Sequence, residues 1–172
     1  MSPTHKNGFT LMELLITISV IVVLSGIAVP VSISLIEKSR QAKCLGNLRE
    51  IGVGLQMYLD DNADHLPVLA LGRSSKTSQE PVLETVLSGY VESEEVFHCP
   101  SDKTEFRKSG CSYNWNITQN GRSITELSFF GHDNRPEITP LVSDKEAWHK
   151  EKTNFLYADS SSSDKVRFVS SE

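Results

Sequence analysis

The chain opens with a long apolar stretch that contains a single charge. From Phe9 to Val29 every side chain is apolar, small or hydroxyl-bearing, except the carboxylate of Glu13. A helix of this length extends roughly 31 Å, which is about the thickness of the hydrocarbon core of a bilayer. The pattern therefore predicts a transmembrane helix over residues 9–30, ending near Pro30.

After Pro30 the hydrophobic pattern changes to that of an amphipathic helix. Apolar residues recur every three or four positions, at Ala42, Leu45, Leu48, Ile51, Leu55 and Leu59. This spacing predicts a helix over residues 31–62 with one face towards a core. Three glycines, Gly46, Gly52 and Gly54, interrupt this helix, and we expect them to let another element approach closely. The run Asp60-Asp61-Asn62 and the later Pro67 mark its end.

The remaining residues, 63–172, predict a small α+β head. A polar stretch over residues 72–80 reads as a flexible loop, and residues 81–88 as a short helix. The segment at 97–103 reads as a turn. Alternating patterns predict antiparallel strands at 111–117, 137–144 and 153–159, with a closing hairpin strand at 165–169 after a mobile loop at Ser160–Ser163.

Composition narrows the functional classes. The chain has 172 residues, 23% of them charged, and a net charge of −5. Basic residues are scattered, whereas nucleic-acid binders usually show a clustered basic stripe, so no nucleic-acid partner is expected. No nucleophile elbow, P-loop or dinucleotide fingerprint occurs, so we expect no enzyme activity and assign no catalytic residue.

The apolar stretch has two conventional interpretations. As a secretory signal peptide it would be cut after Ala28, but Glu13 lies at the mouth of its apolar core and Pro30 lies close to the cut. As a plain signal anchor it leaves Glu13 unexplained. Basic residues also follow the span more than they precede it, which by the positive-inside rule places the head in the cytoplasm.

A third interpretation rests on the segment "KNGFTLMELL" at residues 6–15. Its glycine, aromatic residue and glutamate at fixed offsets before an apolar helix resemble the N-termini of type IV prepilins and type II secretion pseudopilins. The resemblance implies that residues 1–8 form a leader. A membrane aspartyl peptidase would cut between Gly8 and Phe9 and then methylate the new amine of Phe9.

The resemblance carries further expectations. It implies a long N-terminal helix packed on a small antiparallel sheet, with a kink at Pro30 where the embedded half meets the amphipathic half. The alternative is that Pro30 simply stops the membrane helix. The implied location is the bacterial inner membrane, with a single span and a periplasmic head, and the implied partners are other pilin-like subunits, the prepilin peptidase, an inner-membrane assembly platform and lipid. The likeness is strong over residues 7–67 and loose over 68–172.

Glu13 has a physical role under this interpretation. A lone carboxylate in the first turn of a membrane helix costs a few kcal/mol. The amine of Phe9 on a neighbouring subunit neutralises it, so the ion pair sets the stagger between subunits. The alternative is a glutamate that snorkels to the interface. A different class of function also remains: a membrane-anchored extracytoplasmic ligand-binding domain that uses the N-terminus only as a tether.

Three cysteines, Cys44, Cys99 and Cys111, leave the pairing open. Similar proteins carry cysteines on the long helix and in the turn that corresponds to residues 97–103, so the resemblance favours a Cys44–Cys99 disulfide. The rivals are a Cys99–Cys111 bond and three buried free thiols.

The sequence offers two sets of candidate metal ligands. A zinc site assembled from His98, Cys99, Cys111, His132 and His149 lacks the usual spacing between paired ligands, so no metal site is assigned. Some type II major pseudopilins hold calcium in a C-terminal loop, and Asp159, Ser161 and Asp164 offer comparable oxygen atoms, although a solvated loop explains them more simply. Tyr113, Trp115 and Trp148 are expected to pack in the core rather than to line a ligand groove.

Overall fold

The computed structural model describes residues 9–150 and 152–168. The chain divides into two structural units after Lys38. Helix α1 (Leu11–Asp61) runs through this division, so the N-terminal unit contains its apolar part and the C-terminal unit contains the rest of α1 together with the head. The predicted α+β fold, with one long helix and a small antiparallel sheet, is confirmed.

The apolar part of α1 is exposed along its length. Pro30 lies inside the helix, so the alternative that this proline ends the helix is wrong. Proline donates no backbone hydrogen bond, and the helix here continues without that bond. Hydroxyl groups in the apolar part bond back to the helix: Thr17 donates to the Leu14 carbonyl at 2.9 Å and Ser19 donates to the Leu15 carbonyl at 2.8 Å. These bonds leave the surface of the segment apolar.

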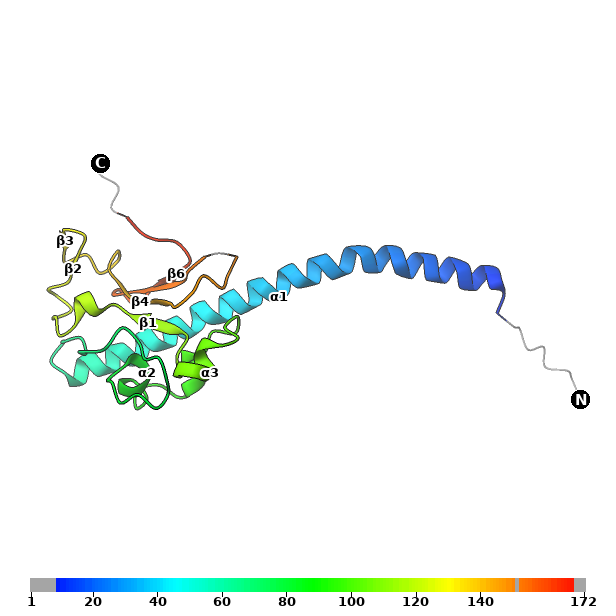
Figure 1. Ribbon diagram of the computed structural model, residues 1–172. Coiled ribbons are helices and arrows are strands. Elements are labelled where there is room, and N and C mark those ends of the chain that lie inside the picture. The colour runs from blue at the N-terminus through cyan, green and yellow to red at the C-terminus, as the bar shows by residue number, and fades with distance from the viewer. Residues whose placement is uncertain (1–8, 151, 169–172) are drawn as a thin grey trace, which may run out of the picture. The chain divides into compact units, whose positions relative to one another are not determined.

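The head carries short elements joined by long connections (Figure 1). Its helical elements are α2 (Leu83–Val86), η1 (Glu94–Phe97), α3 (Glu105–Ser109) and η2 (Ile117–Gln119). Its strands are β1 (Tyr113–Trp115), β2 (Ser128–Phe129), β3 (His132–Asp133), β4 (Pro140–Asp144), β5 (Phe155–Tyr157) and β6 (Ser162–Ser163). An antiparallel sheet has the order β1-β4-β5-β6, and β2 and β3 form a separate pair.

The core lies between the C-terminal part of α1 and the sheet. Leu48, Ile51, Leu55 and Leu59 of α1 are buried, as the spacing predicted, while Ala42 is exposed. They belong to one hydrophobic cluster with sheet residues such as Trp115 and Leu156. Tyr113 and Trp115 are buried and Trp148 packs on the cluster, so the expectation of aromatic core residues is confirmed.

Two of the three helix glycines mark close approaches. A Cβ at Gly54 would lie 3.0 Å from the Tyr90 carbonyl oxygen and 2.9 Å from a Val91 methyl group. A Cβ at Gly52 would lie 3.0 Å from a Leu156 methyl group. Gly46 has no such neighbour within 4 Å, so the expectation of close packing is wrong there.

The closing hairpin differs from its prediction. The strand that returns on β5 is β6, Ser162–Ser163, and the residues expected to pair, 165–168, lie outside any strand; residue 169 lies outside the described residues. Side-chain bonds replace the missing strand: the Tyr157 hydroxyl donates to the Lys165 carbonyl and accepts from the Arg167 amide. Ser162 Oγ also donates a hydrogen bond to the Leu45 carbonyl of α1 at 3.0 Å. This bond to the helix holds the polar serines in position to form β6.

Two other predictions, for residues 81–88 and 72–80, need correction. The helix expected over 81–88 shortens to α2, which begins after Pro81 rather than on it. The stretch expected to be a flexible loop, residues 72–80, is held by Arg73, which lies 2.8 Å from the Glu84 carboxylate with both side chains largely buried. Arg73 Nε also donates to the Ser109 carbonyl at 2.7 Å. A loop-like composition thus conceals a buried ion pair.

Candidate functional site

The first turn of α1 holds the charged group of the apolar segment. The Glu13 carboxylate accepts hydrogen bonds from the Thr10 backbone N–H and the Thr10 hydroxyl, both at 2.9 Å. The Thr10 hydroxyl in turn accepts from the Glu13 backbone N–H at 3.2 Å. Thr10 and Glu13 therefore form a reciprocal capping box, which satisfies donors at the start of the helix. Sequence reasoning missed this cap, although the spacing Thr-x-x-Glu signals it.

The segment behind this cap exposes a continuous apolar surface. Its side chains from Phe9 to Ile36 include no buried residue, and Phe9 itself is 80% exposed. The helix is long and apolar enough to cross a membrane by length and composition. Burial of such a surface in lipid, or among other apolar helices, is strongly favourable relative to water. Gly8, the residue before the predicted cut, lies outside the described residues.

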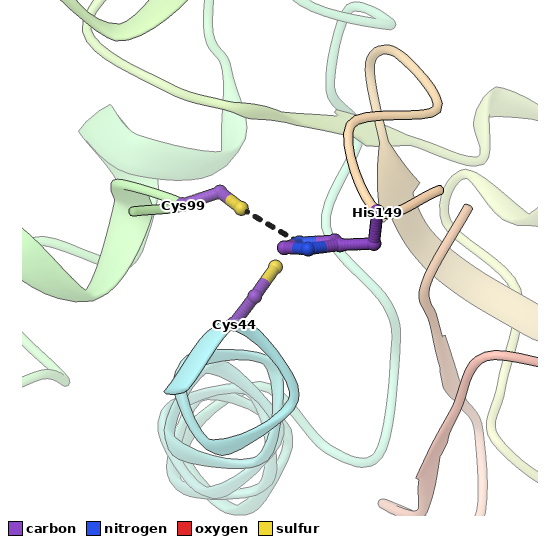
Figure 2. A group of neighbouring side chains, drawn as sticks. All are labelled: Cys44, Cys99 and His149. Atoms are coloured by element: carbon purple, nitrogen blue, oxygen red, sulfur yellow. Dashed lines mark hydrogen bonds between the residues drawn. The ribbon is translucent and has the colours of Figure 1, made fainter. Parts of the chain in front are cut away.

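A second group of side chains lies in the C-terminal unit, where three segments converge at Cys44, Cys99 and His149 (Figure 2). Cys44 is on α1, Cys99 follows η1, and His149 lies on the connection between β4 and β5. One ligand atom of each lies within 4.8 Å of the other two, and all three side chains are buried. Cys99 Sγ is 3.1 Å from His149 Nε2. Figure 2 shows the three side chains pointing towards one another.

The cluster extends to Asp144, the last residue of β4. The Cys44 thiol donates to Asp144 Oδ1 at 3.3 Å, and the Asn154 backbone N–H donates to Asp144 Oδ2 at 2.8 Å. Burial raises the pKa of the Asp144 carboxyl to about 6. The pKa of the Cys44 thiol is raised well above its usual value by its hydrogen bond with Cys99 and by burial. Without a cation, the cluster therefore favours the protonated thiol of Cys44.

The predicted Cys44–Cys99 disulfide is not formed in this structure. Cys44 and Cys99 are close neighbours, as the resemblance implied, but all three cysteines are free and buried. Cys44 Sγ instead makes a hydrogen bond with Asp144, and Cys99 Sγ makes one with His149. Cys111 lies apart from this cluster, its sulfur accepting from the Tyr113 N–H at 3.3 Å.

The other histidines of the candidate zinc set do not converge. The His98 ring stacks on Phe106, with ring centroids 4.4 Å apart, and His132 is exposed on β3. Only Cys99 and His149 of that set come together, and Cys44, which the set omitted, joins them. His149, unlike His98 and His132, therefore lies within a cluster of potential metal ligands.

The candidate calcium ligands are engaged by basic side chains. Asp159 Oδ2 lies 3.3 Å from Arg167 Nη1, and Asp164 Oδ2 lies 2.9 Å from Lys152 Nζ. Asp159 also accepts from the Ser161 N–H at 3.0 Å. This arrangement does not favour a calcium ion, since each carboxylate is already paired with a cation. The calcium site stays a prediction.

Comparison with known proteins agrees with the N-terminal pattern. Residues 3–29 match the family model described as the prokaryotic N-terminal methylation motif. Searches of curated proteins and of solved structures found no match for the chain. The match covers the predicted cut and most of the exposed apolar segment, and it does not reach the head.

Proposed function

Because the chain carries the prepilin-type cleavage and methylation motif, we propose that it is a pilin-like subunit that is cut after Gly8, methylated at Phe9 and assembled into a periplasmic filament. The motif supports a type IV pilin-like or pseudopilin-like precursor. The filament proposed here is that of a type II secretion or type IV pilus system. The observation that carries the proposal is the match at residues 3–29 on an exposed apolar helix.

The exposed surface of α1 supports assembly in addition to anchoring. In the membrane, the apolar side chains of residues 9–36 contact lipid. When a subunit leaves the bilayer, the same side chains need apolar neighbours, because exposing each of them to water costs ~1.5–3 kcal/mol. Packing against the equivalent helices of other subunits supplies these neighbours. The subunit's work in this proposal is structural, and it has no catalytic residue of its own.

Glu13 gives the assembly its register. The capping box satisfies part of the carboxylate within one chain, through Thr10. It leaves the negative charge without a cationic partner in the described residues of that turn. The amine of Phe9 on a neighbouring subunit supplies such a cation after cleavage. The proposed partners are therefore other pilin-like subunits, the prepilin peptidase, an assembly platform in the inner membrane, and lipid.

Intact-mass analysis of the protein from a host with its own peptidase tests this proposal. We expect a mature chain that begins at Phe9 and carries one added methyl group. A Gly8→Val chain, as the control, should retain residues 1–8 and lack the methyl group. A chain that begins at Val29, or an uncut native chain in the presence of the peptidase, contradicts the proposal.

The local cap of Glu13 favours a second candidate function. If Thr10 alone satisfies the carboxylate, α1 needs no neighbour, and the apolar segment acts as a tether for an extracytoplasmic binding domain. The excess of basic residues after the span, such as Lys43 and Arg49, bears on the side of the membrane that the head occupies, and it does so equally for both candidate functions. The same mass measurement separates the two candidates, because a tether needs no methylated Phe9.

A further inference from the structure

We propose that the C-terminal unit contains a structural zinc site formed by Cys44, Cys99, His149 and Asp144. This inference concerns the C-terminal unit alone and does not depend on the proposed filament function. The site joins α1, the turn after η1, the end of β4 and the connection between β4 and β5.

The donor set fits zinc. Structural zinc is bound by four ligands in a tetrahedron, commonly thiolates and imidazole, with carboxylate oxygen as a further ligand. Thiolate and imidazole donors favour zinc over calcium or magnesium, which prefer oxygen atoms throughout. Two cysteines, one histidine and one aspartate provide four donors, and their exposed fractions are 0%, 0%, 1% and 3%. A closed, buried set of four is typical of a structural rather than a catalytic zinc site.

Two pairs of donor atoms already lie close to the spacing of a tetrahedral site. With Zn–S bonds of ~2.3 Å and Zn–N or Zn–O bonds of ~2.0 Å, neighbouring ligand atoms of a tetrahedron are ~3.3–3.8 Å apart. Cys99 Sγ lies 3.1 Å from His149 Nε2, and Cys44 Sγ lies 3.3 Å from Asp144 Oδ1. The two sulfurs and the imidazole nitrogen all lie within 4.8 Å of one another. The two sulfurs and the imidazole nitrogen therefore already surround one point, and Asp144, which contacts Cys44 Sγ through Oδ1, completes the tetrahedron if its carboxylate turns towards that point.

The surroundings provide the hydrogen bonds that orient metal ligands. His149 Nδ1 lies 3.4 Å from the Ser101 hydroxyl, which leaves Nε2 as the atom facing Cys99. The Asn154 backbone N–H fixes the outer oxygen of Asp144, and Asn154 Nδ2 lies 3.4 Å from Cys44 Sγ. Partners of this kind set ligand orientation in known metal sites. An amide donor next to Cys44 also stabilises a thiolate.

Zinc binding exchanges the thiol protons for the metal ion. One Zn²⁺ enters, the thiols of Cys44 and Cys99 release their protons to solvent, and Asp144 binds as carboxylate. The filled site carries one net negative charge. No oxidant or reductant is needed, which distinguishes zinc binding from a Cys44–Cys99 disulfide, whose formation removes two electrons.

Metal analysis of the full-length chain in detergent, purified with a reductant, tests the site. We expect one zinc per chain, and reconstitution of the metal-free chain with Co²⁺ should give the visible spectrum of tetrahedral thiolate-bound cobalt. In competition with a chelator, Cys44→Ser and His149→Ala should each weaken zinc binding by about 100-fold or more, since even the loss of an outer hydrogen-bond partner costs 10–100-fold. Asp144→Asn should weaken it and change the cobalt spectrum.

Cys111→Ser is the matched control, because Cys111 is an equally buried cysteine outside the cluster. It should bind zinc as the native chain does. The cobalt spectrum of the native chain tests the proposal even if a variant fails to fold. A reduced native chain that takes up neither zinc nor cobalt overturns the proposal, as does a Cys44–Cys99 disulfide in protein isolated from its host without metal. Unchanged binding in Asp144→Asn overturns the assignment of that ligand.

Discussion

Asp102 shows how one buried carboxylate organises a segment of the head. It accepts backbone hydrogen bonds from Thr104, Glu105 and Phe106, each at 2.8 Å, and a bond from the Ser112 hydroxyl at 2.6 Å. These bonds satisfy the free N–H groups at the start of α3. Burial tends to raise the pKa of Asp102, but the hydrogen bonds outweigh it and the pKa is lowered. The ionised form therefore stabilises the fold.

This shift predicts the direction of a pH effect. A carboxyl with a lowered pKa in the folded chain contributes stability above its unfolded pKa, ~3.9. The contribution is lost as the pH falls through the folded value. Asp102→Asn should cost about 2 kcal/mol at neutral pH and should flatten the fall in stability below pH ~4. Chemical unfolding of the full chain in detergent at several pH values measures both effects.

Asp133→Asn is the control for this experiment, because Asp133 is exposed on β3. It should leave the pH dependence of the unfolding free energy close to that of the native chain. If Asp102→Asn keeps the native pH dependence, the stabilising role of Asp102 is wrong.

At the level of residues, the sequence identifies those whose role depends on local spacing. Gly8, Phe9 and Glu13 belong to a fixed motif, and the family model confirms that motif. Their roles in cleavage, methylation and assembly stay predictions. The convergence of Cys44, Cys99 and His149 could not be predicted, because the three residues come from segments far apart in the chain. Asp102 lies in a segment that was rightly predicted as a turn, but nothing in its composition shows which N–H groups it meets.

At the level of elements, the C-terminal part of α1 must balance helix propensity against close packing. Its C-terminal part needs helix propensity, yet Gly54 weakens a helix by ~1 kcal/mol relative to alanine. The glycine is needed because the Tyr90 carbonyl and Val91 approach the helix at that point. Packing of the connection after α2 therefore outweighs the local preference of the chain.

Two alanine substitutions in α1 separate these effects. Gly54→Ala should destabilise the chain by ~1–3 kcal/mol through overpacking, less the gain in helix propensity. Gly46→Ala is the matched control: a Cβ there meets nothing within 4 Å, so it should stabilise the chain by up to ~1 kcal/mol. Thermal or chemical unfolding of both variants in the same detergent gives the comparison. Equal effects of the two substitutions would contradict the close approach at Gly54.

Among the elements, those with strong periodicity were predicted and those fixed by single contacts were not. The spacing of Leu48, Ile51, Leu55 and Leu59 identifies the buried face of α1, and alternation locates β1, β4 and β5. The short β6 has only two residues, both serine, so no hydrophobic pattern marks it. Its position depends on a side-chain bond to α1, which a sequence pattern cannot show.

At the level of the whole molecule, the N-terminal unit is built for an apolar environment and the head for water. The apolar side chains of residues 9–36 have no cover in the isolated chain, whereas those of the head form one core. In the proposed function, membrane insertion and assembly would each cover the N-terminal surface. They differ in what they require of Glu13, because insertion favours its removal and assembly through an ion pair requires it.

Glu13→Leu distinguishes these two requirements. It should keep or strengthen membrane retention, because it removes the charge from the apolar segment. It should abolish filaments, because the Phe9 amine of each neighbour then lacks its partner, at a cost of ~3 kcal/mol per contact. Filament yield and membrane fraction are scored separately in the same cells.

Thr10→Val is the companion variant, since it removes the hydroxyl of the capping box but keeps the carboxylate. It should still form filaments if the main role of Glu13 is between subunits. Normal filaments with Glu13→Leu defeat this role, and a loss of filaments with Thr10→Val as severe as with Glu13→Leu assigns the effect to the cap instead.

The burial pattern of α1 has a mechanical consequence. Cys44 is the first buried residue along the helix, just after Gln41, which donates a hydrogen bond to Asp164 at 3.3 Å. If the proposed function holds, a force that draws the N-terminal segment out of the bilayer therefore reaches the buried core at Cys44. If the proposed zinc is bound there, the load spreads at once to three other segments through metal–ligand bonds. Traction on the helix would then be resisted first at one small cross-link, before any of the leucine contacts behind it begins to shear.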